Sequence, residues 1–249
     1  MFMNLAKLRS WINLGLSFVY PEVCQYCKKE RAGPEQGYVG QECQKQIVWI
    51  ERPFCERCGL PFPGEITTQF VCQYCQETEC FFSTARSAVG AKGMVLDIIH
   101  RYKYSKEMWF EPFLTGMLVR QALPVLRMEH WDLVIPVPLH RLRKSERGFN
   151  QAERLARALS KATEIPLDTR YLRRVQETRT QTRLSRKERA ENVRHAFAVR
   201  KGHDLKGRRV VLVDDVRTTG ATTNECARVL QEAGTDEVCI WTLSRGLLN

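Results

Sequence analysis

A nine-residue segment, 214–222, combines the residue types that hold a phosphorylated sugar. It reads Asp-Asp-Val-Arg-Thr-Thr-Gly-Ala-Thr and lies between an apolar run and a predicted helix, where backbone N–H groups and the helix dipole favour an anion. Glycine allows close approach to an oxygen, and threonines offer hydroxyls. Ordinary helix capping explains neither two acids nor three threonines around a glycine. The predicted phosphate-binding residues are Thr218, Thr219, Gly220, Ala221 and Thr222.

Two carboxylates, Asp214 and Asp215, come directly before this predicted phosphate loop. Adjacent acids can accept hydrogen bonds from two vicinal hydroxyls. A sugar phosphate therefore fits the whole segment, with its 5′-phosphate in the threonine turn and its 2′ and 3′ hydroxyls on the two acids. Because the preceding run 210–213 is apolar, we expect both side chains to emerge at the carboxyl edge of a buried sheet.

Cysteines mark a second kind of site, since eight of the ten lie between positions 24 and 80. Two thiols separated by two residues sit on a tight turn that aims both sulfurs at one ion, and two such turns complete a tetrahedral site. Four thiolates leave no open coordination position, so the spacing predicts a structural zinc rather than a catalytic one. The complete set is Cys55, Cys58, Cys72 and Cys75.

A second set of cysteines is incomplete. The positions where a fourth cysteine would complete the pattern hold Gly40 and Gln46. Either Cys80 supplies the missing ligand, or this site is degenerate and binds no metal. The three available ligands of the set are Cys24, Cys27 and Cys43.

The elements that must position these residues fall into two modules, residues 1–80 and 81–249. The first is a predicted helix at 5–19, packed on the body, followed by the cysteine-rich module. In the second, continuous apolar strands joined by helices predict an α/β fold with a parallel sheet covered on both faces. Predicted helices lie at 93–106, 112–127 and 150–159, and a further one follows the segment 214–222 and ends at 233. Predicted strands lie at 131–138, 169–174, 195–199, 209–213 and 238–243. A basic loop is predicted at 176–192.

The segment 214–222 resembles the ribose-phosphate signature of type I phosphoribosyltransferases. Together with further motifs and the paired cysteines in front, the chain resembles the ComF/GntX competence-associated family over nearly its entire length. It departs from that family's pattern at Gly40, where a cysteine is expected. The further motifs are the runs 136–139, 147–151 and 181–185, with Arg189, Asn192 and Val193.

The resemblance implies a type I phosphoribosyltransferase-like parallel sheet with a small N-terminal double zinc-ribbon module. It also implies binding of phosphoribosyl pyrophosphate with Mg²⁺, and in competent bacteria a cytoplasmic role in the uptake of transforming DNA. In the related transferases the ribose C1 becomes cationic as pyrophosphate departs, so Mg²⁺ and basic side chains must neutralise the leaving group.

Site residues follow from the same resemblance. Asp214 and Asp215 take the catalytic positions. Arg141, Arg143 and Lys144 lie by a pyrophosphate loop after the strand at 131–137, and a mobile lid carries Arg179, Arg183 and Arg189. The acceptor of the ribosyl group is not indicated by any motif. The additional substrate-binding candidates are Lys103, Arg141 and Arg147.

Charge supports an anionic ligand. The chain carries a net charge of +11, and residues 139–210 alone hold 21 basic and 8 acidic side chains. This excess suggests a phosphate-rich partner, such as a nucleotide or nucleic acid. The alternative to an enzyme is therefore a zinc-containing scaffold or sensor that binds single-stranded DNA or a helicase-type DNA-uptake partner.

The sequence excludes an integral membrane protein and argues against a secreted one. No apolar run approaches the roughly 20 residues of a membrane span. The modest N-terminal apolar stretch leads into Pro21 rather than a small-residue cleavage site, which argues against a secreted disulfide scaffold and for a reducing compartment.

Overall fold

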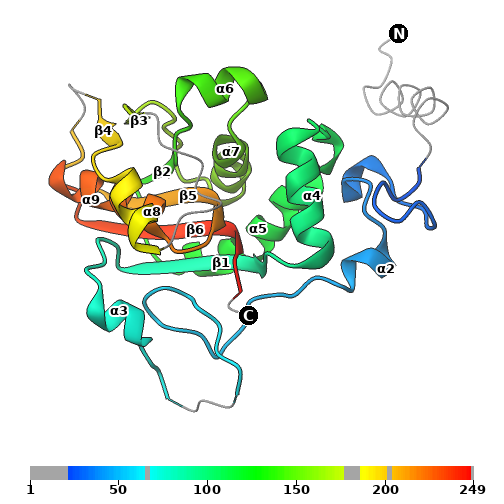
Figure 1. Cartoon of the computed structure of the whole chain (residues 1–249), viewed down its shortest axis with the longest axis horizontal. Helices are drawn as coiled ribbons and strands as arrows, with labels where there is room; N and C mark the ends of the chain where they lie inside the picture. Colours follow the sequence, from blue (N-terminus) through cyan, green and yellow to red (C-terminus); the bar gives the residue numbers. More distant parts are fainter. Residues whose placement is uncertain (1–21, 65–67, 177–185, 201–203, 248–249) are drawn as a thin grey trace, which may run out of the picture.

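A four-stranded parallel sheet forms the centre of the protein (Figure 1). The computed structural model describes residues 22–64, 68–176, 186–200 and 204–247. The strand order is β1-β6-β5-β2, and all four carboxyl ends lie at the same edge, where ligands of open α/β sheets bind. The strands are β1 (Thr84–Gly90), β2 (Leu133–Pro136), β5 (Arg209–Arg217) and β6 (Glu237–Arg245).

Helices cover both faces of this sheet, as the apolar strands predict. One face carries α4 (Gly93–Tyr104), the short η2 (Met108–Phe110), α5 (Glu111–Leu126) and α7 (Gln151–Thr163). The other carries α9 (Ala221–Glu232), which packs against α8 (Arg186–Val193). An antiparallel pair, β3 (Leu172–Arg174) and β4 (Phe197–Val199), joins α9, and α6 (Arg141–Arg147) follows β2.

The apolar run of β5 divides between two cores. Val211 and Val213 pack with the α4, α5 and α7 side, whereas Val210 and Leu212 pack with the α9 side. All four are completely buried. Successive strand residues point to opposite faces, so a strand covered on both sides needs apolar residues at every position.

Several expectations about elements were wrong. Strand β1 was not expected, and β5 runs through the two acids to Arg217 instead of ending at residue 213. The loop predicted at 176–192 overlaps helix α8, and helix α6, which carries Arg141, Arg143 and Lys144 directly after the predicted pyrophosphate loop, was not expected. Polar helix surfaces lack the apolar periodicity that reveals a helix in sequence. The predicted helix at 5–19 lies outside the described residues, and so do Arg179 and Arg183 of the predicted lid.

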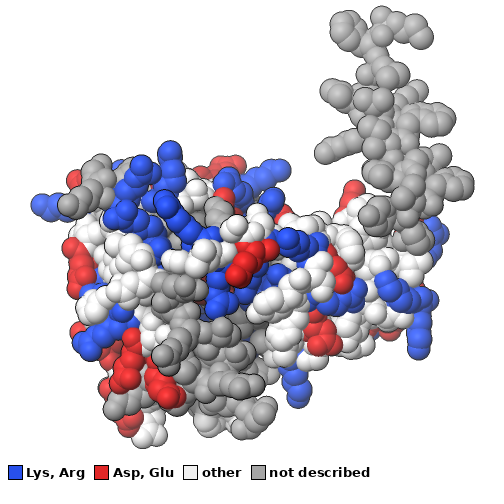
Figure 2. Space-filling view, turned by 45° about the horizontal axis from the view of Figure 1, so that its top comes forward, with Lys and Arg blue, Asp and Glu red and all other residues white. Residues whose placement is uncertain are grey.

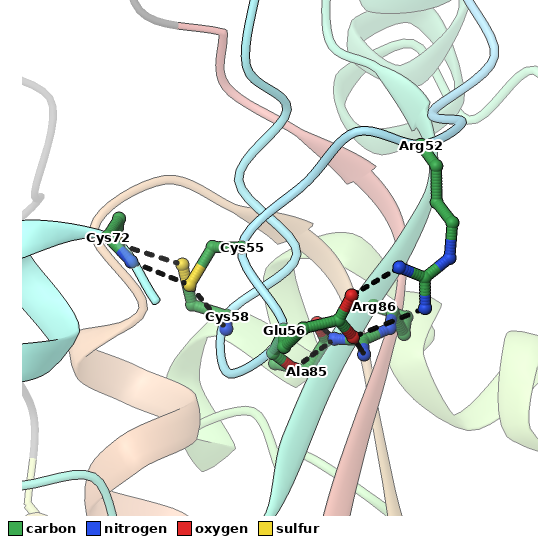
Figure 3. Close-up of polar contacts among 7 residues, drawn as sticks. All are labelled: Arg52, Cys55, Glu56, Cys58, Cys72, Ala85 and Arg86. Atoms are coloured by element: carbon green, nitrogen blue, oxygen red, sulfur yellow. Dashed lines mark hydrogen bonds and ion pairs between the residues drawn. The ribbon is translucent and has the colours of Figure 1, made fainter. Parts of the chain in front are cut away.

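The complete cysteine module lies along β1 and includes α3 (Gln73–Glu77) (Figure 1). The Ala85 N–H donates to the Arg57 carbonyl over 2.7 Å, and Arg86 forms an ion pair of 3.2 Å with Glu56 (Figure 3). A side chain at Gly59 would place its Cβ 2.5 Å from the Ala85 carbonyl, and Gly59 has φ +66°. The tight approach of this module to the sheet therefore depends on glycine.

The incomplete cysteine module, with η1 (Pro34–Gln36) and α2 (Gln41–Gln44), packs on the opposite end of β1. Its buried Cys24, Val39 and Cys43 share a hydrophobic core with Phe113 of α5. Arg101 of α4 donates to the Gln25 carbonyl over 3.0 Å. No helix among the described residues has the length and apolarity to cross a membrane.

Candidate functional site

The predicted phosphate loop connects β5 to the start of α9 at the carboxyl edge of the sheet. Gly220 adopts φ +83° as the N-cap, and a Cβ there would lie 2.6 Å from Nη2 of Arg217. Only glycine fits this turn without strain. A small cavity of about 30 Å³ opens here and is lined by Asp214, Val216 and residues 217–223. The structure therefore brings all five predicted loop residues together with Asp214.

Only one of the two adjacent acids faces this cavity. As neighbours in a strand they point to opposite faces. Asp215 contacts Lys103 of α4, with 2.7 Å between Oδ2 and Nζ, in a cavity on the α5 and α7 side. Asp214 lies on the α9 side with the phosphate loop. Burial, and then the charge of Asp215, raises the pKa of Asp214 to about 7.

Lys103 and Arg147 lie on the same side of the sheet as Asp215. Arg147 donates to Gln151 Oε1 over 3.2 Å and to the Tyr104 hydroxyl over 3.4 Å, and its guanidinium covers the Tyr104 ring. Lys103 is occupied by Asp215. Both cations are thus near one another in the fold, although neither lines the small cavity of the phosphate loop.

Arg141 belongs to a different and much larger cavity of about 720 Å³. This basic groove lies between the loop after β2 and the β3–β4 pair. One of its arginines, Arg174, lowers the pKa of Asp214 through its charge, although burial of Asp214 has the larger and opposite effect. Lys and Arg side chains crowd this side of the molecule (Figure 2). The charged residues lining the groove are Arg141, Arg170, Arg173, Arg174 and Arg200.

The complete cysteine set fits a zinc ion. Its four Sγ atoms lie within 4.8 Å of one another, and Cys58 Sγ lies 3.8 Å from Cys72 Sγ. A tetrahedral ion with Zn–S bonds of about 2.3 Å separates its sulfurs by about 3.8 Å. The Cys72 N–H also donates to Cys55 Sγ over 3.2 Å (Figure 3).

Two buried arginines connect this cysteine set to the sheet edge. Arg217 and Arg245, paired at the ends of β5 and β6, each donate from Nη1 to the Cys58 carbonyl over 2.7 Å. Nη2 of Arg245 also lies 3.6 Å from Cys58 Sγ. A hydrogen bond with Cys75, and then the charges of Arg245 and Arg217, lower the pKa of Cys58 to about 4. The phosphate loop and the cysteine set thus share Arg217.

The incomplete set gathers as predicted but acquires a residue that the sequence analysis missed. Cys24, Cys27 and Cys43 lie together with Glu30, with all four ligand atoms within 4.8 Å. Cys80 is not among them, because it forms a side-chain hydrogen bond with Cys75 in the other set. Cys80 as the missing ligand was therefore wrong. The only sequence signal for Glu30 is its place three residues after Cys27.

Comparison with known proteins assigns both modules. Residues 15–78 match the double zinc ribbon domain family, and residues 145–246 match the phosphoribosyl transferase domain family. These matches confirm the predicted fold class, with a parallel sheet and a structural-zinc module in front.

Whole-length relatives agree with the domain matches. Competence protein F of Haemophilus influenzae is 36% identical over 214 residues, which cover 82% of this chain and 88% of that protein. DNA utilization protein YhgH of Shigella flexneri is 29% identical, with coverage of 91% and 98%. Competence protein ComFC of Bacillus subtilis is 27% identical, with coverage of 77% of each chain.

Proposed function

The chain belongs to the family of competence protein F, and from this membership we propose that it binds phosphoribosyl pyrophosphate with Mg²⁺ in a pathway of DNA uptake or use. The names of the relatives supply the DNA-related context.

One observation carries the ligand proposal: the phosphate loop and the Asp214 carboxylate line the same cavity at the carboxyl edge of the sheet. Backbone N–H groups at the start of α9 suit a 5′-phosphate. Asp214 suits a ribose hydroxyl or a metal ion bound to the ligand. Mg²⁺ is commonly held by one or two carboxylates together with substrate phosphates, so the donor set fits that ion.

We assign supporting roles in binding to Lys103 and to the arginines of the basic groove, which lie outside this cavity. Lys103 neutralises and orients Asp215 through their 2.7 Å contact. Among the arginines of the basic groove, Arg174 acts on Asp214 through its charge, and the groove as a whole offers positive charge that would stabilise a leaving pyrophosphate or an anionic acceptor. Mg²⁺ bound to the diphosphate would add Lewis-acid stabilisation of the same leaving group.

Transfer of the ribosyl group to an acceptor is the finer part of this proposal. The alternative is a scaffold or sensor that retains the phosphate loop but does not turn over. The basic groove favours a polyanionic partner for such a protein, with single-stranded DNA or a helicase-type DNA-uptake protein as candidates. Salt distinguishes the DNA candidate, since affinity should fall by about 0.7 log units per neutralised phosphate for each log unit of salt.

Calorimetry with phosphoribosyl pyrophosphate and Mg²⁺ tests the ligand. The variant carrying both Asp214→Asn and Asp215→Asn should remain folded and lose about 2 kcal/mol or more of binding free energy. A matched control is Asp236→Asn, at the opposite end of the sheet, just before β6. Retention of full affinity by the double variant, or no binding by the wild-type protein, contradicts the proposal.

Turnover needs a separate measurement. Incubation with phosphoribosyl pyrophosphate, Mg²⁺ and a panel of bases, with pyrophosphate release as the readout, separates the two functions. Sustained release supports a transferase. Tight binding without release supports the sensor or scaffold.

A further inference from the structure

The complete cysteine set shows how a metal-binding turn is built in this protein. In the turn from Cys55 to Cys58, the first thiolate accepts a hydrogen bond from the backbone N–H three residues later, with 3.5 Å between Cys58 N and Cys55 Sγ. The first position of such a turn therefore has two tasks. It supplies a metal ligand, and it accepts backbone N–H groups that would otherwise lack a partner.

A turn of the same length in the other module, from Gly40 to Cys43, has no side chain at its first position. Its backbone N–H groups are nevertheless satisfied. The Cys43 N–H donates to Glu30 Oε1 over 3.1 Å, and the Glu42 N–H donates to Glu30 Oε2 over 2.9 Å. In both turns the backbone N–H of the last residue is thus bound by a side chain: the Cys58 N–H by the Cys55 thiolate, and the Cys43 N–H by the Glu30 carboxylate.

Glu30 also occupies the space of the missing side chain. A Cβ built on Gly40 would lie 2.0 Å from Cδ and 2.4 Å from Oε2 of Glu30. Separations this short are excluded by sterics, so a cysteine at position 40 and the observed carboxylate cannot coexist in this arrangement. The side chain of Glu30 therefore fills the space that a side chain at position 40 would take.

The carboxylate faces the three thiols of the set. Its Oε1 lies 3.7 Å from Cys27 Sγ, and the Sγ atoms of Cys24 and Cys43 are 3.7 Å apart. Ligands at about 2.3 Å for sulfur and 2.0 Å for oxygen around a tetrahedral zinc lie about 3.5 to 3.8 Å from one another. Within the part of the chain that the structure describes, no Lys or Arg forms an ion pair with Glu30.

We propose that Glu30 is the fourth ligand of a second zinc ion, bound with Cys24, Cys27 and Cys43 in place of the cysteine that Gly40 lacks. A divalent cation would offset part of the charge of three thiolates and a carboxylate, and among the described residues no Lys or Arg pairs with Glu30 to do so. The proposal does not depend on the sugar-phosphate site. Glu30 as the ligand replaces both alternatives that the sequence left open, namely Cys80 as the fourth ligand and a site that binds no metal.

Zinc content of the chelator-washed, full-length protein tests the assignment. We expect two zinc ions per chain in the wild type and one in Glu30→Gln, which keeps size and hydrogen-bonding capacity but weakens the ligand. The control Glu42→Gln alters an exposed acid of the same turn that pairs with Lys45, and it should keep two. One zinc in the wild type, or two in Glu30→Gln, overturns the proposal.

A second variant, in which one ligand is exchanged for another, distinguishes loss of the ligand from misfolding of the module. The double variant Glu30→Ala with Gly40→Cys removes the steric conflict and restores four cysteines, so it should recover two zinc ions. A folded double variant with one zinc overturns the place given to Glu30. Cobalt substitution gives a second readout: the thiolate charge-transfer band should correspond to seven Co–S bonds in the wild type and eight in the double variant, and equal intensities overturn the proposal.

Discussion

Replacement of Arg245 by Met tests how the complete zinc ribbon is held on the sheet. A zinc ion with four thiolates carries a net charge of −2, and the buried Arg217 and Arg245 carry +2 beside Cys58. Arg245 is only 6% exposed, so water screens this interaction weakly. The variant keeps most of the apolar stem and removes one of the two compensating charges.

The expected size follows from the 3.6 Å between Arg245 Nη2 and Cys58 Sγ. At an effective dielectric constant of about 20, two unit charges at that distance attract by about 5 kcal/mol. A sulfur bound to zinc shares its charge with the metal, which reduces the interaction to about 2 kcal/mol. The zinc affinity of this site should therefore fall about 30-fold.

Competition with a chromophoric zinc chelator measures the change. Arg52→Met is the matched control, because Arg52 lies in the same ribbon and pairs with Glu56 at an exposed position (Figure 3). It should leave the zinc affinity within about two-fold, as expected for a surface ion pair. If Arg245→Met released zinc no more readily than Arg52→Met, the charge-balance argument would be refuted.

Three further predictions concern the phosphate side. Burial raises the pKa of Asp214 to about 7, so between about pH 5.5 and 7.5 the folded state holds a proton that the unfolded chain has lost. The free energy of unfolding should therefore fall by about 2 kcal/mol over this pH range, as measured by urea titration. Asp214→Asn should remove this dependence on pH. Lys103→Met leaves Asp215 without its 2.7 Å partner and should lower the free energy of unfolding by about 2 kcal/mol, whereas an unchanged urea midpoint would contradict the pairing. Gly220→Ala places a Cβ 2.6 Å from Arg217 Nη2 at φ +83° and should cost about 1 to 2 kcal/mol of stability by thermal unfolding, with weaker ligand binding by calorimetry.

The phosphate loop could be predicted because all its parts are contiguous. Five residues and the preceding acid belong to one strand-turn-helix unit, whose local geometry does not depend on distant segments. The divergence of Asp214 and Asp215 was also available in principle, since alternate strand residues face opposite sides. It was missed because β5 was expected to end before the acids.

The sequence by itself determined the fold class and the complete zinc set, because strand periodicity and the spacing of paired cysteines are properties of short segments. Only the tertiary structure decided which residues complete these sites across the chain. Cys58 meets Arg217 and Arg245 over separations of 159 and 187 residues. Glu30 reaches the empty first position of a turn ten residues away only because the chain between them folds back. Contacts of this kind leave no periodic signal, because they depend on how separate turns and strands pack rather than on the conformation of any one of them.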